Sequence, residues 1–276
     1  MLLALTGATG FIGQHLLREL PNRGYQVRVL LRRPTAVPTW SASAVIGDLA
    51  RPQNMSAALE GVAAVIHSAG LAQAMSGVPE DDYRIANTEA TIGLARAARR
   101  AGVKRFVFLS SVRAQCGPTA DTVLTEAAEP RPTDAYGKSR LAAERGLAEL
   151  DIDWVSLRAM LVYGRGVTGN MAQLMRLARS PFPLPLGSLR ARRSLLAVEN
   201  LLAAIEAVLA APGTLRRPFH CRRSARANRH GNDRRHALWA RAQAECFPAP
   251  RDAARTPASH RRPRIHLRAA VRLARR

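Results

Sequence analysis

The sequence is poor in cysteine and has no long apolar run. Its three cysteines, Cys116, Cys221 and Cys246, are scattered and odd in number. They form neither a disulfide framework nor a metal-ligand spacing, so we expect a reducing, cytoplasmic compartment and no metal site. No apolar run is long enough to span a bilayer, so no membrane span is expected. Met1–Leu5 has no basic region before it and leads directly into a glycine turn, so we expect a strand there and not a signal peptide.

Acidic residues and lysine are scarce as well. The chain has 20 Asp and Glu against 42 Lys and Arg, a formal net charge of +22 that is typical of a nucleic-acid partner. The distribution argues against that partner, because residues 220–276 alone carry 16 of the basic and 3 of the acidic residues. Only Lys104 and Lys138 are lysines, a bias that fits a GC-rich genome better than selection for phosphate contacts. Nucleic acid is therefore not an expected partner.

Three glycines mark the start of the chain. Gly7, Gly10 and Gly13 have the spacing G-x-x-G-x-x-G, between the apolar run Leu2–Leu5 and a stretch of helical period at 14–20. Strand, glycine turn and helix in this order place a diphosphate on a helix N-terminus. Gly7 allows a tight turn, Gly10 lets the backbone approach the phosphates, and Gly13 lets the helix pack close to the strand. The stretch predicts a dinucleotide-binding unit, with a plain glycine turn as the alternative.

Strand-like and helix-like segments alternate along the first 219 residues. The expected strands are 2–5, 26–31, 45–46, 63–67, 105–109 and 154–158. The expected helices include 14–20, 55–59, 82–101, 135–144, 169–177 and 199–209. This alternation predicts an α/β fold with a Rossmann-type doubly wound parallel sheet and a small C-terminal substrate domain. Ligands of such a sheet bind at the carboxyl ends of its strands.

The end of the second expected strand bears on the choice of cofactor. An acidic residue there favours a free ribose 2′-hydroxyl, whereas a basic one accommodates a 2′-phosphate. Arg32 occupies this position and Arg33 follows it. The pair favours NADP slightly over NAD, with two solvated arginines as the alternative interpretation.

A tyrosine and a cation share one face of an expected helix. Tyr136 and Arg140 are four residues apart, whereas Lys138 points elsewhere. A tyrosine hydroxyl beside a cofactor can act as acid or base when a nearby cation favours its ionised form. A serine hydroxyl can orient the substrate oxygen that the tyrosine protonates, and Ser110 and Ser111 end the preceding strand.

Together these features resemble the extended short-chain dehydrogenase/reductases, the NAD-dependent epimerase/dehydratase family. The resemblance covers about residues 1–219 and is carried by TGATGFIG, GDL, HSAG, Asn87, FLSS, YGKSR, VYG and the RRS before ENL. The stretch Asn170 to Leu201 looks most like bacterial nucleotide-sugar 4-epimerases and 4-keto-sugar reductases of surface-polysaccharide synthesis. The resemblance implies a dinucleotide-binding domain over residues 1–160 and a substrate-binding part over residues 161–219.

The resemblance also implies roles by position. The residues implied to hold the cofactor are Gly7, Gly10, Phe11, Ile12, Gly13, Asp48, Leu49, Ala69 and Gly70, together with Arg32, Tyr136 and Arg140. Ser111 and Tyr136 would be catalytic, with Arg140 as the cation. Ser111, Asn170 and Arg193 would bind the substrate, the last two at its diphosphate, although Arg193 could equally be a surface arginine. Expected partners are the nucleotide-sugar substrate and a second copy of the chain in a homodimer.

Three positions depart from the family pattern. The family has Tyr-x-x-x-Lys, and Arg140 stands where the lysine is expected. Arginine keeps the positive charge, but its planar fork differs in reach and it cannot pass a proton on, so we expect weakened catalysis. Val112 replaces a serine or threonine that often follows the serine pair, which makes Ser111 the better candidate. Ala159 stands where proline is common.

Residues 220–276 lose all periodicity and consist mainly of Arg, Ala, Pro and His. A poorly ordered basic tail and a nucleic-acid arm are two interpretations. A third is a frameshifted gene: one choice of synonymous codons for His220 to Ala237, read one nucleotide later, gives IADAQPALTDMEMIAAMR, which resembles the usual C-terminal region of the family. We prefer the third interpretation, under which the substrate domain is incomplete.

Two function classes follow. The first is an NAD(P)-dependent epimerase/dehydratase-type oxidoreductase that acts at C4 of a nucleotide-linked sugar, as a 4-epimerase or a 4-keto reductase. The second is a catalytically impaired, cofactor-binding scaffold or the product of a frameshifted gene.

Overall fold

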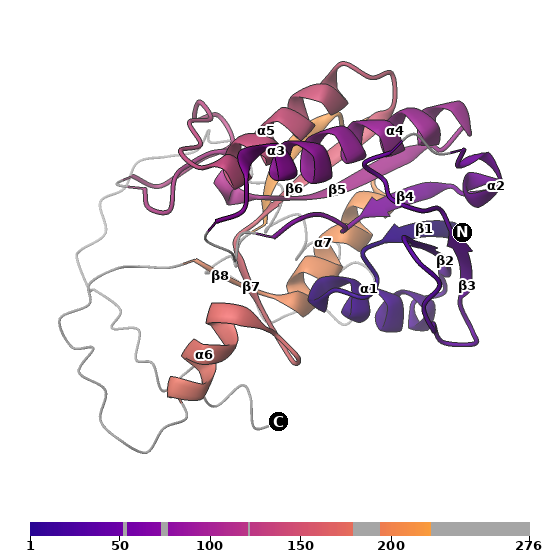
Figure 1. Ribbon diagram of the computed structural model, residues 1–276, viewed down its shortest axis with the longest axis horizontal. Coiled ribbons are helices and arrows are strands. Elements are labelled where there is room, and N and C mark those ends of the chain that lie inside the picture. The colour runs from indigo at the N-terminus through magenta and orange to yellow at the C-terminus, as the bar shows by residue number, and fades with distance from the viewer. Residues whose placement is uncertain (52–53, 73–76, 121, 179–193, 222–276) are drawn as a thin grey trace, which may run out of the picture.

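The computed structural model describes residues 1–51, 54–72, 77–120, 122–178 and 194–221. Its centre is a seven-stranded parallel sheet of strand order β3-β2-β1-β4-β5-β6-β9 (Figure 1). The strands of this sheet are β1 (Leu2–Thr6), β2 (Gln26–Leu31), β3 (Ala42–Val45), β4 (Ala64–His67), β5 (Arg105–Ser111), β6 (Asp153–Ala159) and β9 (Arg217–Cys221). The order reverses between β1 and β4, the switch point at which doubly wound sheets bind their ligands.

Helices cover both faces of the sheet (Figure 1). One face carries α1 (Phe11–Asn22) and α7 (Val198–Ala210), and the other carries α2 (Ser56–Leu59), α3 (Glu80–Tyr83), α4 (Ala90–Arg100) and α5 (Ala135–Ala148). Two apolar clusters fill the two layers, because alternate strand residues face opposite sides: Leu5, for example, packs with α1, and Ala4 packs with α4. The sheet is therefore buried on both faces, as an all-parallel sheet requires.

A buried arginine attaches α7 to the start of β5. The Arg105 guanidinium forms an ion pair with Asp153 at 2.7 Å and donates to the carbonyl oxygens of Val208 and Ala211 at the end of α7. Carbonyls in the last turn of a helix lack their usual i+4 partner, and Val208 accepts only a 3.4 Å bond from the Ala211 N–H, so the arginine completes them and fixes the helix on the sheet. Residues 198–210 thereby belong to the same core as residues 1–20.

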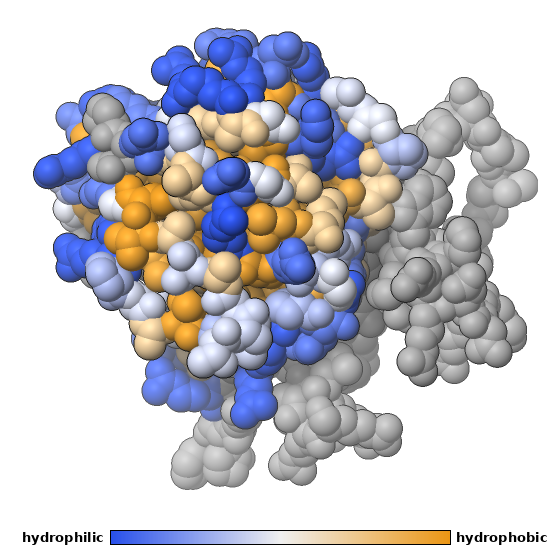
Figure 2. Space-filling model, turned by 90° about the vertical axis from the view of Figure 1, so that its right-hand side faces the viewer, coloured by the Kyte–Doolittle hydropathy of each residue, from blue (hydrophilic) through white to orange (hydrophobic). Residues whose placement is uncertain are grey.

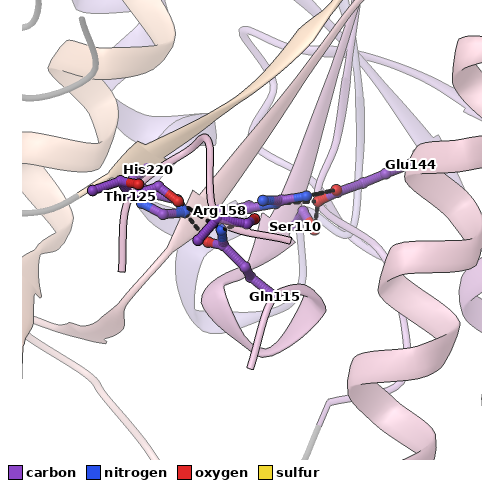
Figure 3. Close-up of polar contacts among 7 residues, drawn as sticks. Ser110, Gln115, Thr125, Glu144, Arg158 and His220 are labelled. Atoms are coloured by element: carbon purple, nitrogen blue, oxygen red, sulfur yellow. Dashed lines mark hydrogen bonds and ion pairs between the residues drawn. The ribbon is translucent and has the colours of Figure 1, made fainter. Parts of the chain in front are cut away.

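A polar layer lies between the sheet and α5, where β5, β6 and β9 run side by side (Figure 3). Ser110, Arg158 and His220 are neighbours in register across these strands. Arg158 forms a two-pronged ion pair with Glu144 of α5, its closest atoms 2.6 Å apart, and Ser110 donates to the same carboxylate at 2.6 Å. His220 contacts Gln115, whose amide donates to the carbonyl oxygens of Thr125 and Ala128. Charge-assisted contacts thus join β5 and β6 to α5, and the His220 contact joins β9 to the segment after β5.

The edge strand β3 leaves apolar side chains in solvent. Trp40 and Val45 are each 54% exposed, and Figure 2 shows apolar surface among polar groups on the side of the molecule that carries this edge. Short edge strands of this kind end a sheet without a covering element.

The structure confirms the predicted fold class, a Rossmann-type parallel sheet with flanking helices. Some boundaries differ. The short strand expected at 45–46 is found at Ala42–Val45, and β9 extends to Cys221, two residues into the segment assigned to the tail. Beyond the predicted division at residue 160, α7 packs against the main sheet and β9 is the last strand of that sheet. Arg193 and residues 222–276 lie outside the described part of the chain.

Candidate cofactor and active site

The glycine turn after β1 leaves no room for a side chain at Gly7 or Gly13. Gly7 has a φ of +70°, which favours glycine, and a Cβ there would lie 2.6 Å from the amide nitrogen of Ala69 after β4. A Cβ on Gly13 would collide with the Gly7 carbonyl oxygen. Gly10 donates from its backbone N–H to the same carbonyl at 3.0 Å and closes the turn. The turn therefore holds β1, β4 and α1 at backbone contact distance.

The N-terminus of α1 is open to an anion. Its N-cap residue, Gly10, offers no side chain to the free backbone N–H groups, and the first turn has no acidic residue. Phe11 and Ile12 are half-buried in this first turn. Unpaired N–H groups and the positive end of the helix favour a phosphate, so the residues present fit the diphosphate of a dinucleotide.

Two short segments lie where the adenosine of a bound dinucleotide is expected. Arg32 directly follows β2, is exposed, and forms no ion pair within the described ranges. Asp48 is exposed and accepts the backbone N–H of Ala50 at 3.0 Å, while Leu49 packs against the core beside α2. Sequence reasoning placed all three at this edge of the sheet.

The segment after β4 lies against a buried arginine and a buried asparagine. A Cβ on Gly70 would come within 2.6 Å of Arg140 Nη2 and 2.8 Å of Asn87 Oδ1. Asn87 also pairs with both backbone groups of Leu71, accepting at 2.8 Å and donating at 3.1 Å. Ala69 and Gly70, predicted to line the cofactor, are thus brought next to Arg140.

Asn87 lies in a π-helical turn, Arg84–Glu89, between α3 and α4. Its side chain is fully buried and also donates to Ser139 Oγ at 3.1 Å. Ser139 in turn donates to the Tyr136 carbonyl at 2.8 Å. The turn therefore connects the segment after β4 to the first turn of α5. Such π-turns are frequent at functional sites.

Tyr136 and Arg140 lie together near the start of α5. Asp134 caps this helix by accepting the N–H of Gly137 at 2.7 Å. The Arg140 guanidinium carbon lies 5.2 Å from the centre of the Tyr136 ring and 5.4 Å from that of Phe108. Lys138 points away and pairs with Glu80 at 3.6 Å. The i, i+4 spacing thus places a cation beside the tyrosine, as the sequence predicted.

Arg140 is buried, and no described residue supplies it with a counter-ion. It is 6% exposed, its Nε has no hydrogen-bond partner in the described part of the chain, and its one protein hydrogen bond there is a 3.4 Å contact to the Leu109 carbonyl. An unpaired guanidinium of this kind is costly unless a ligand completes it. Its position between Gly70 and Tyr136 is where such a ligand would lie.

The two serines at the end of β5 have different surroundings. Ser110 is buried and donates to Glu144. Ser111 is half-buried, and its hydroxyl oxygen accepts the N–H of Arg113 at 3.2 Å, so its proton remains available for another partner. This difference favours Ser111 over Ser110 as the serine that meets a substrate.

The expected substrate side is only partly described. Asn170 is the second residue of α6 (Gly169–Ala178), and Arg193 lies outside the described residues. The strands β7 (Leu161–Tyr163) and β8 (Leu195–Ala197) form a separate parallel pair. Gly164 follows β7, and a Cβ there would lie 3.5 Å from the Phe11 ring. The segment after β7 therefore meets the first turn of α1.

His67 is a site residue to which sequence reasoning gave no role. It is fully buried at the end of β4, and burial and the charge of Arg140 lower its pKa from 6.5 to about 3. Its nitrogens lie 2.7 Å from Thr6 Oγ1 and 3.0 Å from Thr91 Oγ1. The sequence offered one indication of this contact: two adjacent apolar strands each end in a polar residue, Thr6 and His67.

Comparison with known proteins decides the family. The model of the NAD dependent epimerase/dehydratase family matches residues 3–220. The chain belongs to this family. The match ends within β9, one residue before the last described position. The resemblance inferred from the sequence motifs is thereby confirmed.

Proteins with different activities resemble the chain. A UDP-glucose 4-epimerase of Vibrio cholerae is 34% identical over 206 residues, which cover 71% of this chain and 62% of the relative. A ceramide reductase of Caulobacter vibrioides is 33% identical over 200 residues, 71% of this chain and 57% of the relative. The chain thus spans about three fifths of the length of these relatives.

Solved structures share the fold. The structure described as MoeE5 in complex with UDP-glucuronic acid and NAD has a TM-score of 0.64 and 31% identity, covering 79% of this chain and 74% of its own. A UDP-galactose 4-epimerase has a TM-score of 0.65 and 26% identity, covering 80% and 77%.

Within the described ranges, no group of three or more His, Cys, Asp or Glu side chains could hold a metal ion. No helix in that part of the protein is long and apolar enough to cross a membrane.

Proposed function

We propose that this family member is an NAD(P)-dependent oxidoreductase that acts at C4 of a nucleotide-linked sugar, as a 4-epimerase or a 4-keto reductase. The observation that carries the proposal is the convergence of the open N-terminus of α1, Gly70, Ser111, Tyr136 and the unpaired Arg140 at one edge of the sheet. The UDP-glucose 4-epimerase relative and the MoeE5 complex support this substrate class.

The chain supplies binding and proton transfer. A bound nicotinamide would provide the hydride chemistry. Gly7, Gly10 and Gly13 would hold its diphosphate against the backbone N–H groups of α1. Tyr136 would exchange a proton with the sugar hydroxyl, and Ser111 would orient the oxygen that bears it. Epimerisation requires the keto-sugar to turn over before hydride returns, whereas reduction does not.

Arg140 has a narrower role than the lysine of the family pattern. It holds a positive charge beside the Tyr136 ring and donates hydrogen bonds, but it cannot pass a proton on. It would therefore act as a charge and a hydrogen-bond donor only. Asn170 and Arg193 would bind the sugar nucleotide's diphosphate.

Turnover of UDP-glucose or UDP-galactose, and of the corresponding N-acetylhexosamines, with NAD⁺ or NADPH tests the proposal. We expect product with at least one sugar pair, and loss of at least about 100-fold in kcat for Tyr136→Phe because the proton donor is removed. Lys138→Met on the same helix is the matched control. Product formation that survives Tyr136→Phe would contradict the assigned role.

A cofactor-binding scaffold without turnover is the second candidate. Arg140 at the lysine position favours it, as does the unusual composition of residues 220–276. Binding of NADPH with no turnover of any sugar nucleotide would support this candidate. The frameshift hypothesis is tested by the gene: the nucleotide sequence after codon 220, read one nucleotide later, should encode a strand followed by an amphipathic helix.

A further inference from the structure

We propose that His67 is a positioning residue: as the neutral Nε2–H tautomer, it couples the glycine turn that would hold the cofactor to the helix that carries Tyr136. The proposal deepens the function proposed above and rests on it for the identity of the ligand. The coupling itself is a property of described hydrogen bonds that run in one direction through the core.

At Thr91, the surroundings determine which group donates each hydrogen bond. Thr91 Oγ1 lies 2.6 Å from the carbonyl oxygen of Asn87, which can only accept, so the threonine proton is used there. The contact between His67 Nε2 and Thr91 Oγ1, at 3.0 Å, must then be donated by the histidine. Nε2 therefore carries the proton.

The donors of the hydrogen bonds on the Nδ1 side of His67 follow from this assignment. A neutral imidazole with a proton on Nε2 has an acceptor at Nδ1. Thr6 must donate to it at 2.7 Å, which leaves the Thr6 oxygen free to accept the Ala69 N–H at 3.2 Å. Ala69 is the residue whose backbone nitrogen lies against Gly7. The chain of donors thus begins at the glycine turn.

The chain continues from Thr91 to α5. Thr91 donates to the backbone of Asn87, and the Asn87 side chain holds Leu71 and Ser139. Ser139 donates to the carbonyl oxygen of Tyr136. Two parts of the site that share no covalent neighbour, Ala69 and Tyr136, are therefore connected through His67.

The surroundings of His67 maintain its neutral form. Its ring stacks on Phe108, with centroids 5.7 Å apart, and lies near Phe106 at 5.9 Å. The charged group that acts on it is the Arg140 guanidinium, which opposes protonation. Loss of the Thr91 hydroxyl removes the reason for a proton on Nε2. The histidine can then place it on Nδ1, and Thr6 loses its acceptor.

Thr91→Val tests the coupling, with Thr88→Val as the matched control. Thr88 is three residues earlier and donates to the Ser139 carbonyl at 2.8 Å, a bond that involves neither His67 nor Thr6. Long-range ¹H–¹⁵N spectra of the imidazole should show a protonated Nε2 in the wild type and a mixture of tautomers in Thr91→Val. Amide exchange at Ala69 should accelerate about 3- to 10-fold in Thr91→Val and stay unchanged in Thr88→Val.

The affinity for NADPH, measured by titration, should fall by the same factor of about 3 to 10 in Thr91→Val. Thr91→Ser, which keeps the hydroxyl, should restore both the tautomer and the affinity. A wild-type His67 protonated on Nδ1 would overturn the proposal, as would Ala69 exchange that responds equally to Thr88→Val and Thr91→Val. These spectroscopic outcomes stand without sugar turnover, so a failed sugar assay would contradict the proposed function and leave this inference intact.

Discussion

His15 on α1 donates a hydrogen bond from Nε2 to the carbonyl oxygen of Arg165 at 2.7 Å, across 150 positions of sequence. The direction follows from the other nitrogen, because Nδ1 accepts from the Arg18 guanidinium at 3.1 Å and arginine can only donate. Arg165 follows β7, on the expected substrate side. The helix that would hold the diphosphate and the segment after β7 are thus joined by a directed bond.

We expect His15→Phe to impair the substrate side selectively. A phenyl ring keeps the edge contact with Phe11, whose centroid lies 5.3 Å from that of His15, but it cannot bond to Arg165. The KM for the sugar nucleotide should rise about 3- to 10-fold, since the bond contributes about 1 kcal/mol, while the Kd for NADPH should change less than about twofold. Gln14→Ala in the same turn is the control. An equal loss in both constants would contradict a selective role.

Arg140→Lys should raise turnover. A lysine ammonium has the same charge but can pass a proton on, which the guanidinium cannot. We expect kcat to increase about 10-fold, with the NADPH affinity nearly unchanged. Arg145→Lys, an exposed arginine on the same helix, should have no effect. An unchanged kcat in Arg140→Lys would contradict the hypothesis that arginine limits catalysis at this position.

Two glycine substitutions should separate folding from cofactor binding. A Cβ on Gly13 would collide with the Gly7 carbonyl, so Gly13→Ala should lower the free energy of unfolding by about 1–3 kcal/mol. A Cβ on Gly10 meets its nearest atom, the same carbonyl oxygen, at 3.4 Å, and Gly10 has a φ of −80° that alanine adopts. Gly10→Ala should therefore fold normally and lose about 10-fold or more in NADPH affinity, because the methyl group occupies the phosphate approach. Urea unfolding and NADPH titration of both variants provide the measurement.

Arg32→Ser should change the preference between the two cofactors. The guanidinium is exposed at the end of β2 without an ion-pair partner in the described ranges, so a 2′-phosphate can bind to it. The NADPH affinity should fall about 10-fold and the NADH affinity should stay within about twofold, in line with a charged hydrogen bond of about 1.5 kcal/mol. The control is Arg99→Ser, which removes an exposed arginine near the end of α4. Equal losses for both cofactors would refute a 2′-phosphate role.

Stability should decrease in mild acid because of His67. The folded protein holds this histidine neutral with a pKa of about 3, against 6.5 for the unfolded chain. Below pH 6.5 the unfolded state binds a proton that the folded state does not, so stability is complete above that pH and is lost towards pH 3. The slope is on the order of 1.4 kcal/mol per pH unit. Urea unfolding between about pH 6 and 5 should show this slope in the wild type and a smaller one in His67→Gln.

Local sequence pattern was enough to predict how the backbone is arranged at the candidate cofactor site. Gly7, Gly10 and Gly13 constrain the backbone directly, so their spacing predicts a geometry that packing cannot change. The proximity of Tyr136 and Arg140 follows from helical spacing alone. The fold class was predictable for the same reason, since alternating strands and helices permit few arrangements.

The remaining features depend on contacts between distant segments. The bond from His15 to Arg165 and the layer around Arg158, Glu144 and His220 join residues that no local period relates. Strand β9 was missed because Arg217 and Pro218 are unusual in a strand, whereas pairing with β6 fixes them in one. Tertiary context overrode propensity at that edge.

Because of the π-helical turn at Arg84–Glu89, the orientation of Asn87 depends on a single additional residue in the helix. A π-turn holds one residue more than an α-helical path would, and each residue of an α-helix turns the chain by about 100°. Deleting one residue there would straighten the path from Glu80 to Arg100 and rotate Asn87 away from Leu71 and Ser139. In alignments of homologous sequences, gaps usually fall in loops. In this chain, a gap placed in the middle of a helix would decide which residue is compared with Asn87.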